Sequence, residues 1–206
     1  MNIGIIGSGR MGGAVGTRLA EAGHKVLFSS RNPDQLTDLV QQAGANASAG
    51  YPADAIEFGQ VILIAVPYGA LPQIGADYAA LMQGKIVIDC GNPRADRDGP
   101  MADEAIEKGT GVASAEYLPG THLVRAFNAI SFVEVRNEAH REGELIGVPI
   151  AGDDANALAV TSQLVSDSGF EPVIVGGLNR AREFDRGTDV YVRGLTAAQL
   201  RAALNL

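Results

Sequence analysis

Six residues near the N-terminus constrain the fold more than any other part of the chain. Residues Gly7–Gly12 form the pattern G-x-G-x-x-G directly after the apolar run Ile3–Ile6, and a helical pattern follows. The first glycine of this pattern permits a tight turn, the second lets the backbone approach a pyrophosphate, and the third lets the helix pack on the strand. The free N–H groups of the helix then hold the phosphates. The pattern predicts a dinucleotide-binding unit; the alternative is a glycine-rich turn with a structural role only.

The rest of the chain continues this alternation of short apolar runs and helical patterns. The further runs expected to form strands are Lys25–Ser29, Val61–Val66, Lys85–Asp89, Leu123–Phe127, Val148–Ala151 and Pro172–Val175. The helical patterns are Met11–Ala22, Asn32–Ala43, Leu71–Met82, Ala155–Ser168 and Asn179–Leu206, the last with a break near Gly194. Continuous apolar strands are typical of a parallel sheet covered by helices. The predicted class is α/β: a Rossmann-type doubly wound, mainly parallel sheet with a small C-terminal helical part.

Composition narrows the choice of ligands and surroundings. The formal net charge is −8 without a basic run, which argues against nucleic acid and anionic membranes as partners. The longest apolar run, Val61–Val66, is far shorter than the roughly 20 residues that span a bilayer. A single cysteine, Cys90, excludes an internal disulfide and a cysteine-rich metal site. We therefore expect a cytoplasmic globular protein.

The second predicted strand ends in residues that favour NADP over NAD. The run Lys25–Ser29 is followed by Ser30, Arg31 and Asn32. NAD-binding folds usually place an acidic residue here, which bonds the ribose 2′-hydroxyl. No acidic residue stands at this point, and the planar guanidinium of Arg31 suits a 2′-phosphate, to which Ser30 can also donate. Alternatively, Arg31 is a solvated loop residue and Ser30 belongs to a helix cap, with Asn32 as the N-cap residue.

Two further strand ends are expected at the same edge of the sheet, where such folds bind their ligands. Val66 and Pro67 would form an apolar wall beside the ribose and the nicotinamide, and Asn92 would bond the ligand. Tyr68, just past a strand end, is a candidate for stacking on an acceptor ring. The alternative is that Pro67 and Pro93 only terminate strands.

The order and spacing of six segments resemble a known family over nearly the whole chain. These segments are Gly7–Gly12, Ser30–Asn32, Ala65–Pro67, Val124–Asn128, Ala151–Asp154 and Gly176–Gly177. The chain resembles the NADP-dependent oxidoreductases that reduce coenzyme F420, an 8-hydroxy-5-deazaflavin. The same domain occurs as the cytoplasmic NADPH module of membrane ferric reductases.

The resemblance implies a division of the chain and a set of contacts. Residues 1–150 would form the NADP-binding Rossmann domain, and residues 151–206 a small α/β extension that closes the acceptor pocket. The implied pyrophosphate loop is Ser8, Gly9, Arg10 and Met11. Ser30 and Arg31 would hold the 2′-phosphate, whereas the residues implied near the nicotinamide and the acceptor are Val66, Ala70, Asn128 and Ala129. The segment after the fifth strand departs from the family pattern, so the acceptor contacts do not carry over.

Hydride transfer between a nicotinamide and a flavin-like ring depends on positioning and needs no obligatory protein acid or base. We therefore assign no catalytic residue and no metal. Asp154, which precedes a helix, is expected to be an N-cap residue rather than a chelating partner of Asp153. Cys90 is expected to be a buried structural thiol. His24 and His140 are expected at the surface, and His122 is expected at the start of a strand, far from the edge that binds ligands.

The C-terminal stretch is rich in arginine and ends in apolar residues. The arginines would either receive an anionic acceptor or form a solvated, salt-bridged face with the interleaved acidic residues; they are Arg180, Arg182, Arg186, Arg193 and Arg201. The apolar residues are compatible with packing on a second subunit in a homodimer; they are Leu200, Ala203, Leu204 and Leu206.

Three functions are consistent with these features. The first is an NADP(H)-dependent oxidoreductase with a flavin-like or deazaflavin (F420) acceptor. The second is a reductase of a small imine or carbonyl compound, like pyrroline-5-carboxylate reductase. Those enzymes usually carry a long helical dimerisation domain, for which too few residues follow Gly152. The third is a non-catalytic NADP-binding sensor.

Overall fold

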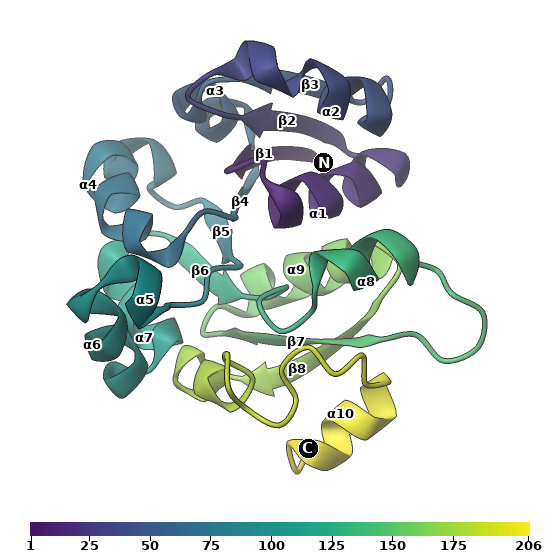
Figure 1. Cartoon of the computed structure of the whole chain (residues 1–206). Helices are drawn as coiled ribbons and strands as arrows, with labels where there is room; N and C mark the ends of the chain where they lie inside the picture. Colours follow the sequence, from purple (N-terminus) through teal and green to yellow (C-terminus); the bar gives the residue numbers. More distant parts are fainter.

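The structure is a computed structural model that describes all residues from 1 to 206. Eight strands form one sheet in the order β3-β2-β1-β4-β5-β6-β7-β8, which Figure 1 shows crossing the whole molecule. The strands are β1 (Asn2–Ile6), β2 (Lys25–Ser29), β3 (Ala47–Gly50), β4 (Val61–Ile64), β5 (Ile86–Asp89), β6 (His122–Arg125), β7 (Gly147–Gly152) and β8 (Glu171–Gly176). The first six strands are parallel. Their order is that of a dinucleotide-binding fold: strands β1 to β3 extend the sheet to one side, and from β4 onward the strands extend it to the other side of β1.

Helices cover both faces of the sheet. The α-helices are α1 (Arg10–Glu21), α2 (Thr37–Ala43), α3 (Pro52–Phe58), α4 (Leu71–Met82), α5 (Ala95–Asp98), α6 (Pro100–Lys108), α7 (Thr110–Tyr117), α8 (Phe132–Asn137), α9 (Ala155–Asp167) and α10 (Ala197–Ala203). Three short 3₁₀ helices complete the fold: η1 (Pro33–Leu36), η2 (Tyr68–Ala70) and η3 (Leu178–Glu183). No helix is both long enough and apolar enough to cross a bilayer.

Burial on both faces explains the continuous apolar strands. In β4, Val61 and Leu63 belong to the core beneath α1 and α9, whereas Ile62 and Ile64 belong to the core beneath α4 and α7. Side chains alternate between the faces of a strand, so a strand covered on both sides needs apolar residues at every position. The predicted doubly wound α/β class is confirmed, and each predicted strand lies within about two residues of an observed one.

Three parts of the predicted secondary structure differ from the structure. Strand β3 was not predicted, because the edge segment Ala47–Gly50 has only small side chains and two of them are exposed. Helices α3 and α5 to α8 were not predicted either. The stretch Asn179–Leu206 is not one helix: η3 and α10 flank an irregular segment, residues 184–195. Gly187 and Gly194 have positive φ angles of 96° and 59° within that segment, a conformation that a helix does not contain.

The C-terminal part continues the sheet instead of forming a separate layer. Strand β7 pairs antiparallel with β6, through Val124 with Gly152 and Arg125 with Ala151, and β8 then pairs parallel with β7. The boundary predicted after residue 150 therefore falls inside β7. Leu200 and Leu204, which suggested a subunit contact, are 2% and 6% exposed and pack in the protein's own C-terminal core.

Candidate functional site

The glycine loop lies where β1 ends and α1 begins, and its three glycines differ in what they require. Gly7 has a φ of +93°, and a Cβ on Gly12 would lie 2.1 Å from the carbonyl oxygen of Gly7. The fold itself therefore requires glycine at both positions. A Cβ on Gly9 would have no protein atom within 4 Å. The space beside Gly9 is open for a ligand, which is the fit that a pyrophosphate needs.

The start of α1 is also suited to bind an anion. Gly9 is its N-cap residue and offers no side-chain hydrogen bond to the first turn, which contains no acidic residue. The first N–H groups are therefore free, and the positive end of the helix faces the loop. The hydroxyl of Ser8 donates to the Ser29 carbonyl at 3.0 Å, which ties the loop to the end of β2.

A cavity of about 610 Å³ extends from this loop between the end of β2 and α4. Ser30 and Arg31 lie on its wall, and the Oγ of Ser30 accepts from the Asn32 amide at 3.1 Å. The hydroxyl proton of Ser30 is therefore free to donate to a phosphate. Asn32 itself is exposed and lies outside the lining; it occupies the expected N-cap position, before η1 with Pro33 in the first turn, but its side chain forms no capping hydrogen bond.

Sequence reasoning missed the opposite wall of this cavity. It is formed by α3 and α4 through Pro52, Gln73, Ile74, Asp77 and Tyr78. Residues inside a helix do not stand at a strand end, so no motif marks them. Pro67 and Ala70 also line this first cavity, although the family resemblance implied the nicotinamide side for Ala70.

A second cavity, of about 410 Å³, shares Val66 with the first and lies over the ends of β4 and β5. We call it the acceptor-side cavity. Its lining residues are Met11, Ala65, Val66, Cys90, Gly91, Asn92, Arg94, Arg97, Arg186 and Tyr191. Val66 and Asn92 are thus where the sequence analysis expected them. Tyr191 and Arg186 come from the irregular C-terminal segment, which no local pattern assigns to the site.

Asn128 and Ala129 lie behind this cavity and do not line it. They are 2% and 7% exposed. The Nδ2 of Asn92 donates to the Asn128 carbonyl at 2.8 Å, and the Nδ2 of Asn128 donates to Asp185 at 3.2 Å. Asn128 therefore holds the Asn92 side chain and the C-terminal segment in place, and it does not face the cavity itself.

Tyr68 is not available to an acceptor, so the expectation that it stacks on one is wrong. The residue is 1% exposed, and its hydroxyl bonds Ser114 Oγ at 3.0 Å and the Thr110 carbonyl at 3.3 Å. Burial and the nearby Asp89 carboxylate raise the pKa of Tyr68 above its ordinary value. Although η2 begins only a few residues after β4 ends, it turns this ring inward against Thr110 and Ser114 of α7.

A buried charge network underlies the acceptor-side cavity. Arg125 is fully buried and donates to Asp89 at 2.6 Å and to Asp185 at 3.1 Å. Burial alone would lower the pKa of Arg125, but the two carboxylates outweigh it and raise that pKa. Asp89 and Arg125 are neighbours in the register of β5 and β6, which the sequence could have shown. Asp185 comes from the C-terminal segment, and only the tertiary structure brings it here.

The remaining candidates have structural roles. Cys90 is 8% exposed, and burial followed by the neighbouring Asp89 raises the pKa of its thiol, so the expectation of a buried thiol is confirmed. Asp154 accepts from the Ala157 amide at 2.7 Å as the expected N-cap of α9. His140 is exposed as expected, and His122 begins β6 as expected. His24 is buried, because it bonds the N-terminal amine at 3.1 Å and Asp167 at 2.9 Å; its expected surface exposure is wrong.

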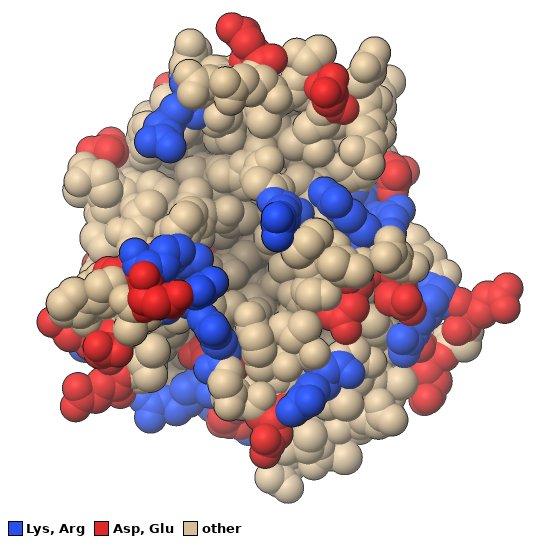
Figure 2. Space-filling model, viewed as in Figure 1, with Lys and Arg blue, Asp and Glu red and all other residues tan.

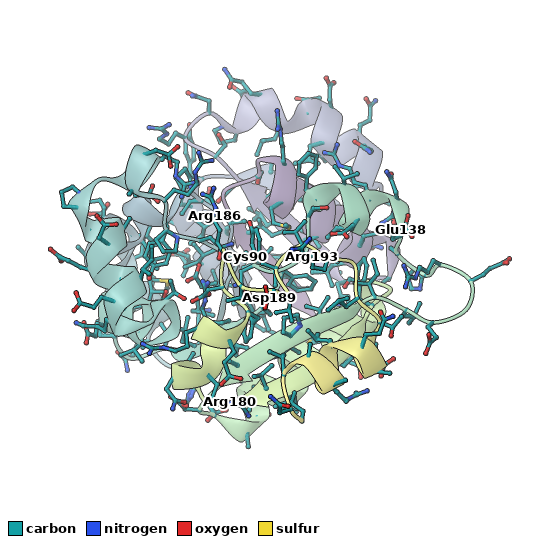
Figure 3. The ribbon with its side chains drawn as sticks, turned by 60° about the horizontal axis from the view of Figure 1, so that its bottom comes forward. Cys90, Glu138, Arg180, Arg186, Asp189 and Arg193 are labelled. Carbon is teal, nitrogen blue, oxygen red and sulfur yellow. The ribbon has the colours of Figure 1, made fainter.

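Of the C-terminal arginines, some form the expected salt-bridged face and one lies where it could receive an anionic acceptor. Arg180 pairs with Glu183 at 2.7 Å and Arg201 with Glu171 at 3.2 Å, as expected of a solvated, salt-bridged face. Arg186 lies elsewhere: Figure 3 shows it on the same side as Cys90, with Arg180 at the far end of the C-terminal part. Figure 2 shows a hollow in the middle of one face with basic side chains around its rim.

The strand order, the glycine loop and the two joined cavities define a dinucleotide-binding protein of the Rossmann class. Comparison with known proteins points the same way: residues 2–93 match the model of the family described as "NADP oxidoreductase coenzyme F420-dependent". The chain is thus similar to proteins of the family that its sequence resembles.

Two curated relatives and one solved structure illustrate this placement. Metalloreductase STEAP3 of Rattus norvegicus is 32% identical over 190 residues, which are 89% of this chain and 35% of the relative. The chain thus spans about a third of the metalloreductases it matches. The F420-dependent NADP reductase of Methanothermobacter marburgensis is 25% identical over 209 residues, 93% of this chain and 91% of the relative. A crystal structure of a hypothetical protein from Sinorhizobium meliloti has a TM-score of 0.83 at 24% identity and covers 95% of both chains.

Proposed function

We propose that the protein binds NADP(H) in the cleft formed by the first cavity and the acceptor-side cavity, and that it transfers a hydride between this cofactor and a flavin-like or deazaflavin acceptor. The observation that carries the proposal is the end of β2. There Ser30 and Arg31 face the first cavity, and no carboxylate stands at the position that bonds a ribose 2′-hydroxyl in NAD-binding folds. The names of the matched relatives support the same cofactor.

The residues of the cleft suit the two halves of the dinucleotide. Gly9 leaves room for the pyrophosphate at the start of α1, and the guanidinium of Arg31 is exposed and forms none of the protein's ion pairs. Val66 stands between the two cavities. It would separate the adenosine half from the nicotinamide half.

The acceptor-side cavity holds residues that position rings and no obvious acid or base. NADPH, when bound, supplies the hydride. Met11 and Val66 form an apolar wall, and Asn92 is held by its bond to Asn128. Tyr191 is half-buried and presents an aromatic ring to the same space. Since a flavin-like ring accepts the hydride directly, close contact of the two rings contributes most of the catalysis.

The experiment that tests this proposal starts with the cofactor. Purified protein and its Arg31→Ala variant are titrated with NADPH and NADH. The variant should lose about 1.5–3 kcal/mol of NADPH binding, the magnitude of a hydrogen bond to a charged group, and keep its NADH affinity. Equal losses for the two cofactors would refute the role of Arg31.

The acceptor is tested in parallel by following NADPH oxidation with a deazaflavin, with FMN and with ferric chelates. The last of these follows from the metalloreductase relatives. Fast turnover with the deazaflavin or with FMN supports the proposal and identifies the acceptor class, whereas turnover with a ferric chelate alone, which accepts single electrons and no hydride, would contradict it. Tight NADPH binding without oxidation by any of them would refute hydride transfer to these acceptors and would favour a non-catalytic NADP sensor.

A further inference from the structure

The acceptor-side cavity is basic in an otherwise acidic protein. Its lining contains three arginines, Arg94, Arg97 and Arg186, and no carboxylate, while the chain as a whole has a net charge of −8. An adjoining cavity of about 660 Å³ shares Arg94 and Arg186 and adds Arg182. A cleft lined by one sign of charge concentrates ligands of the opposite sign.

Of these arginines, Arg186 alone has its whole guanidinium available. Arg94 pairs with Asp96 at 2.5 Å, and Arg97 pairs with Asp98 and also donates to the Asn92 carbonyl at 2.9 Å. Arg182 donates to two backbone carbonyls, those of Glu107 and Lys108. Arg186 is exposed, and its side chain takes part in none of the protein's ion pairs; the arginine pair that shares a cavity with it is that of Arg94 with Asp96.

The carboxylate next to Arg186 in the sequence does not neutralise it. Both oxygens of Asp185 are directed inward: Oδ1 accepts from Arg125 and Asn128, and Oδ2 accepts from Thr110. Asp185 therefore shares the buried Arg125 with Asp89 and forms no ion pair with Arg186. Asp189, three residues further along the chain, lines a different cavity. Asp96 is the acidic group near Arg186 in the adjoining cavity, and Arg94 holds it.

The same bonds of Asp185 fix where Arg186 stands. The buried network ties the irregular C-terminal segment to the ends of β5 and β6, beneath the acceptor-side cavity. Arg186 follows directly and lies on the wall of both cavities. An unpaired guanidinium on a rigidly anchored segment is preorganised for a ligand and loses little freedom when it binds one.

We propose that Arg186 binds an anionic group, a phosphate or a carboxylate, carried by the hydride acceptor. This inference rests on the proposed function, since the acceptor must lie beside the nicotinamide in the same cavity. The planar fork of arginine matches both anions in a bidentate geometry. Arg94, at the junction of the two cavities, contributes charge to the same site.

The test compares FMN with riboflavin, which share one ring system and differ by a phosphate. Binding to protein saturated with NADP⁺ is followed by flavin fluorescence, so that the 2′-phosphate site at Arg31 is already occupied. Wild-type protein should bind FMN at least about tenfold more tightly than riboflavin, the effect of one charge-assisted hydrogen bond. Arg186→Ala should remove this difference by weakening FMN alone, and Arg186→Lys should restore part of it.

The matched control is Arg193→Ala, which removes the same charge from the same segment at a residue that lines neither cavity. It should leave the FMN preference intact. Inorganic phosphate should compete with FMN in wild-type protein and not in Arg186→Ala. The FMN preference should also shrink with rising salt, because screening weakens exposed charge contacts.

Any of three results would overturn the proposal: equal affinity for FMN and riboflavin, no binding of either by wild-type protein, or equal losses in the Arg186 and Arg193 variants. The NADPH affinity of each variant is measured in the same experiment. Normal NADPH binding without an FMN preference refutes the anion site and leaves the cofactor proposal standing. Failure of wild-type protein to bind NADPH refutes the proposed function itself.

Discussion

Replacing Gly9 with alanine should weaken NADPH binding while leaving the stability of the fold nearly unchanged. A methyl group at this position would meet no protein atom within 4 Å, and the backbone angles of Gly9, φ −77° and ψ −154°, are open to alanine. The lost freedom of the unfolded chain contributes about 0.4–1 kcal/mol of stability. The poorer N-cap costs a similar amount. The free energy of unfolding should therefore change by less than about 1 kcal/mol, or roughly 2–4 °C in Tm.

NADPH binding by the same variant should fall much further. The methyl group would occupy the space in which the pyrophosphate approaches the start of α1. Loss or lengthening of two charge-assisted hydrogen bonds, each about 1.5–3 kcal/mol, predicts at least about 3 kcal/mol of lost binding. That loss corresponds to roughly a hundredfold in Kd. Fluorescence titration with NADPH gives the affinity, and thermal unfolding without cofactor gives the stability.

Two neighbouring glycines provide the controls. A Cβ on Gly13 would meet Leu39 at an ordinary 3.4 Å, so Gly13→Ala in the interior of α1 should gain about 0.5–1 kcal/mol of stability and bind NADPH normally. Gly12→Ala would force a Cβ to 2.1 Å from the Gly7 carbonyl and should destabilise the fold itself. The reasoning is refuted if Gly9→Ala binds NADPH like wild-type protein, or if it unfolds like Gly12→Ala.

Two further predictions concern buried groups. Tyr68→Phe should cost about 1 kcal/mol of stability, because a buried hydrogen bond is lost, and should leave acceptor kinetics unchanged; altered KM for the acceptor at unchanged Tm would contradict its buried position. Burial raises the pKa of the Cys90 thiol, so the unfolded chain loses this proton at lower pH than the folded protein does. Stability should therefore fall above the unfolded pKa of about 8.5, by up to about 1.4 kcal/mol per pH unit. Denaturant unfolding at several alkaline pH values should show a shallower fall in Cys90→Ala, and identical slopes for the two proteins would refute this.

Much of the first cavity could be predicted from the chain because its signals are local. The turn at Gly7, the close packing at Gly12 and the pair Ser30 and Arg31 each depend on a few consecutive residues and on the strand before them. Parallel strands bring their carboxyl ends to one edge, so these segments meet wherever the sheet forms. Strand β3 was missed for the opposite reason: its small side chains at an edge carry no pattern.

The sequence by itself determined the class of fold, the glycine loop and the residues at the end of β2 that line the first cavity, because alternating burial and glycine geometry are properties of short segments. Only the tertiary structure decided the acceptor side. It turned Tyr68 inward, set Asn128 behind Asn92, and brought Arg186 and Tyr191 over the ends of β4 and β5. The placement of the C-terminal segment that carries Arg186 and Tyr191 depends on Asp185 meeting the buried Arg125 across 60 residues of chain, and no local pattern encodes such a contact.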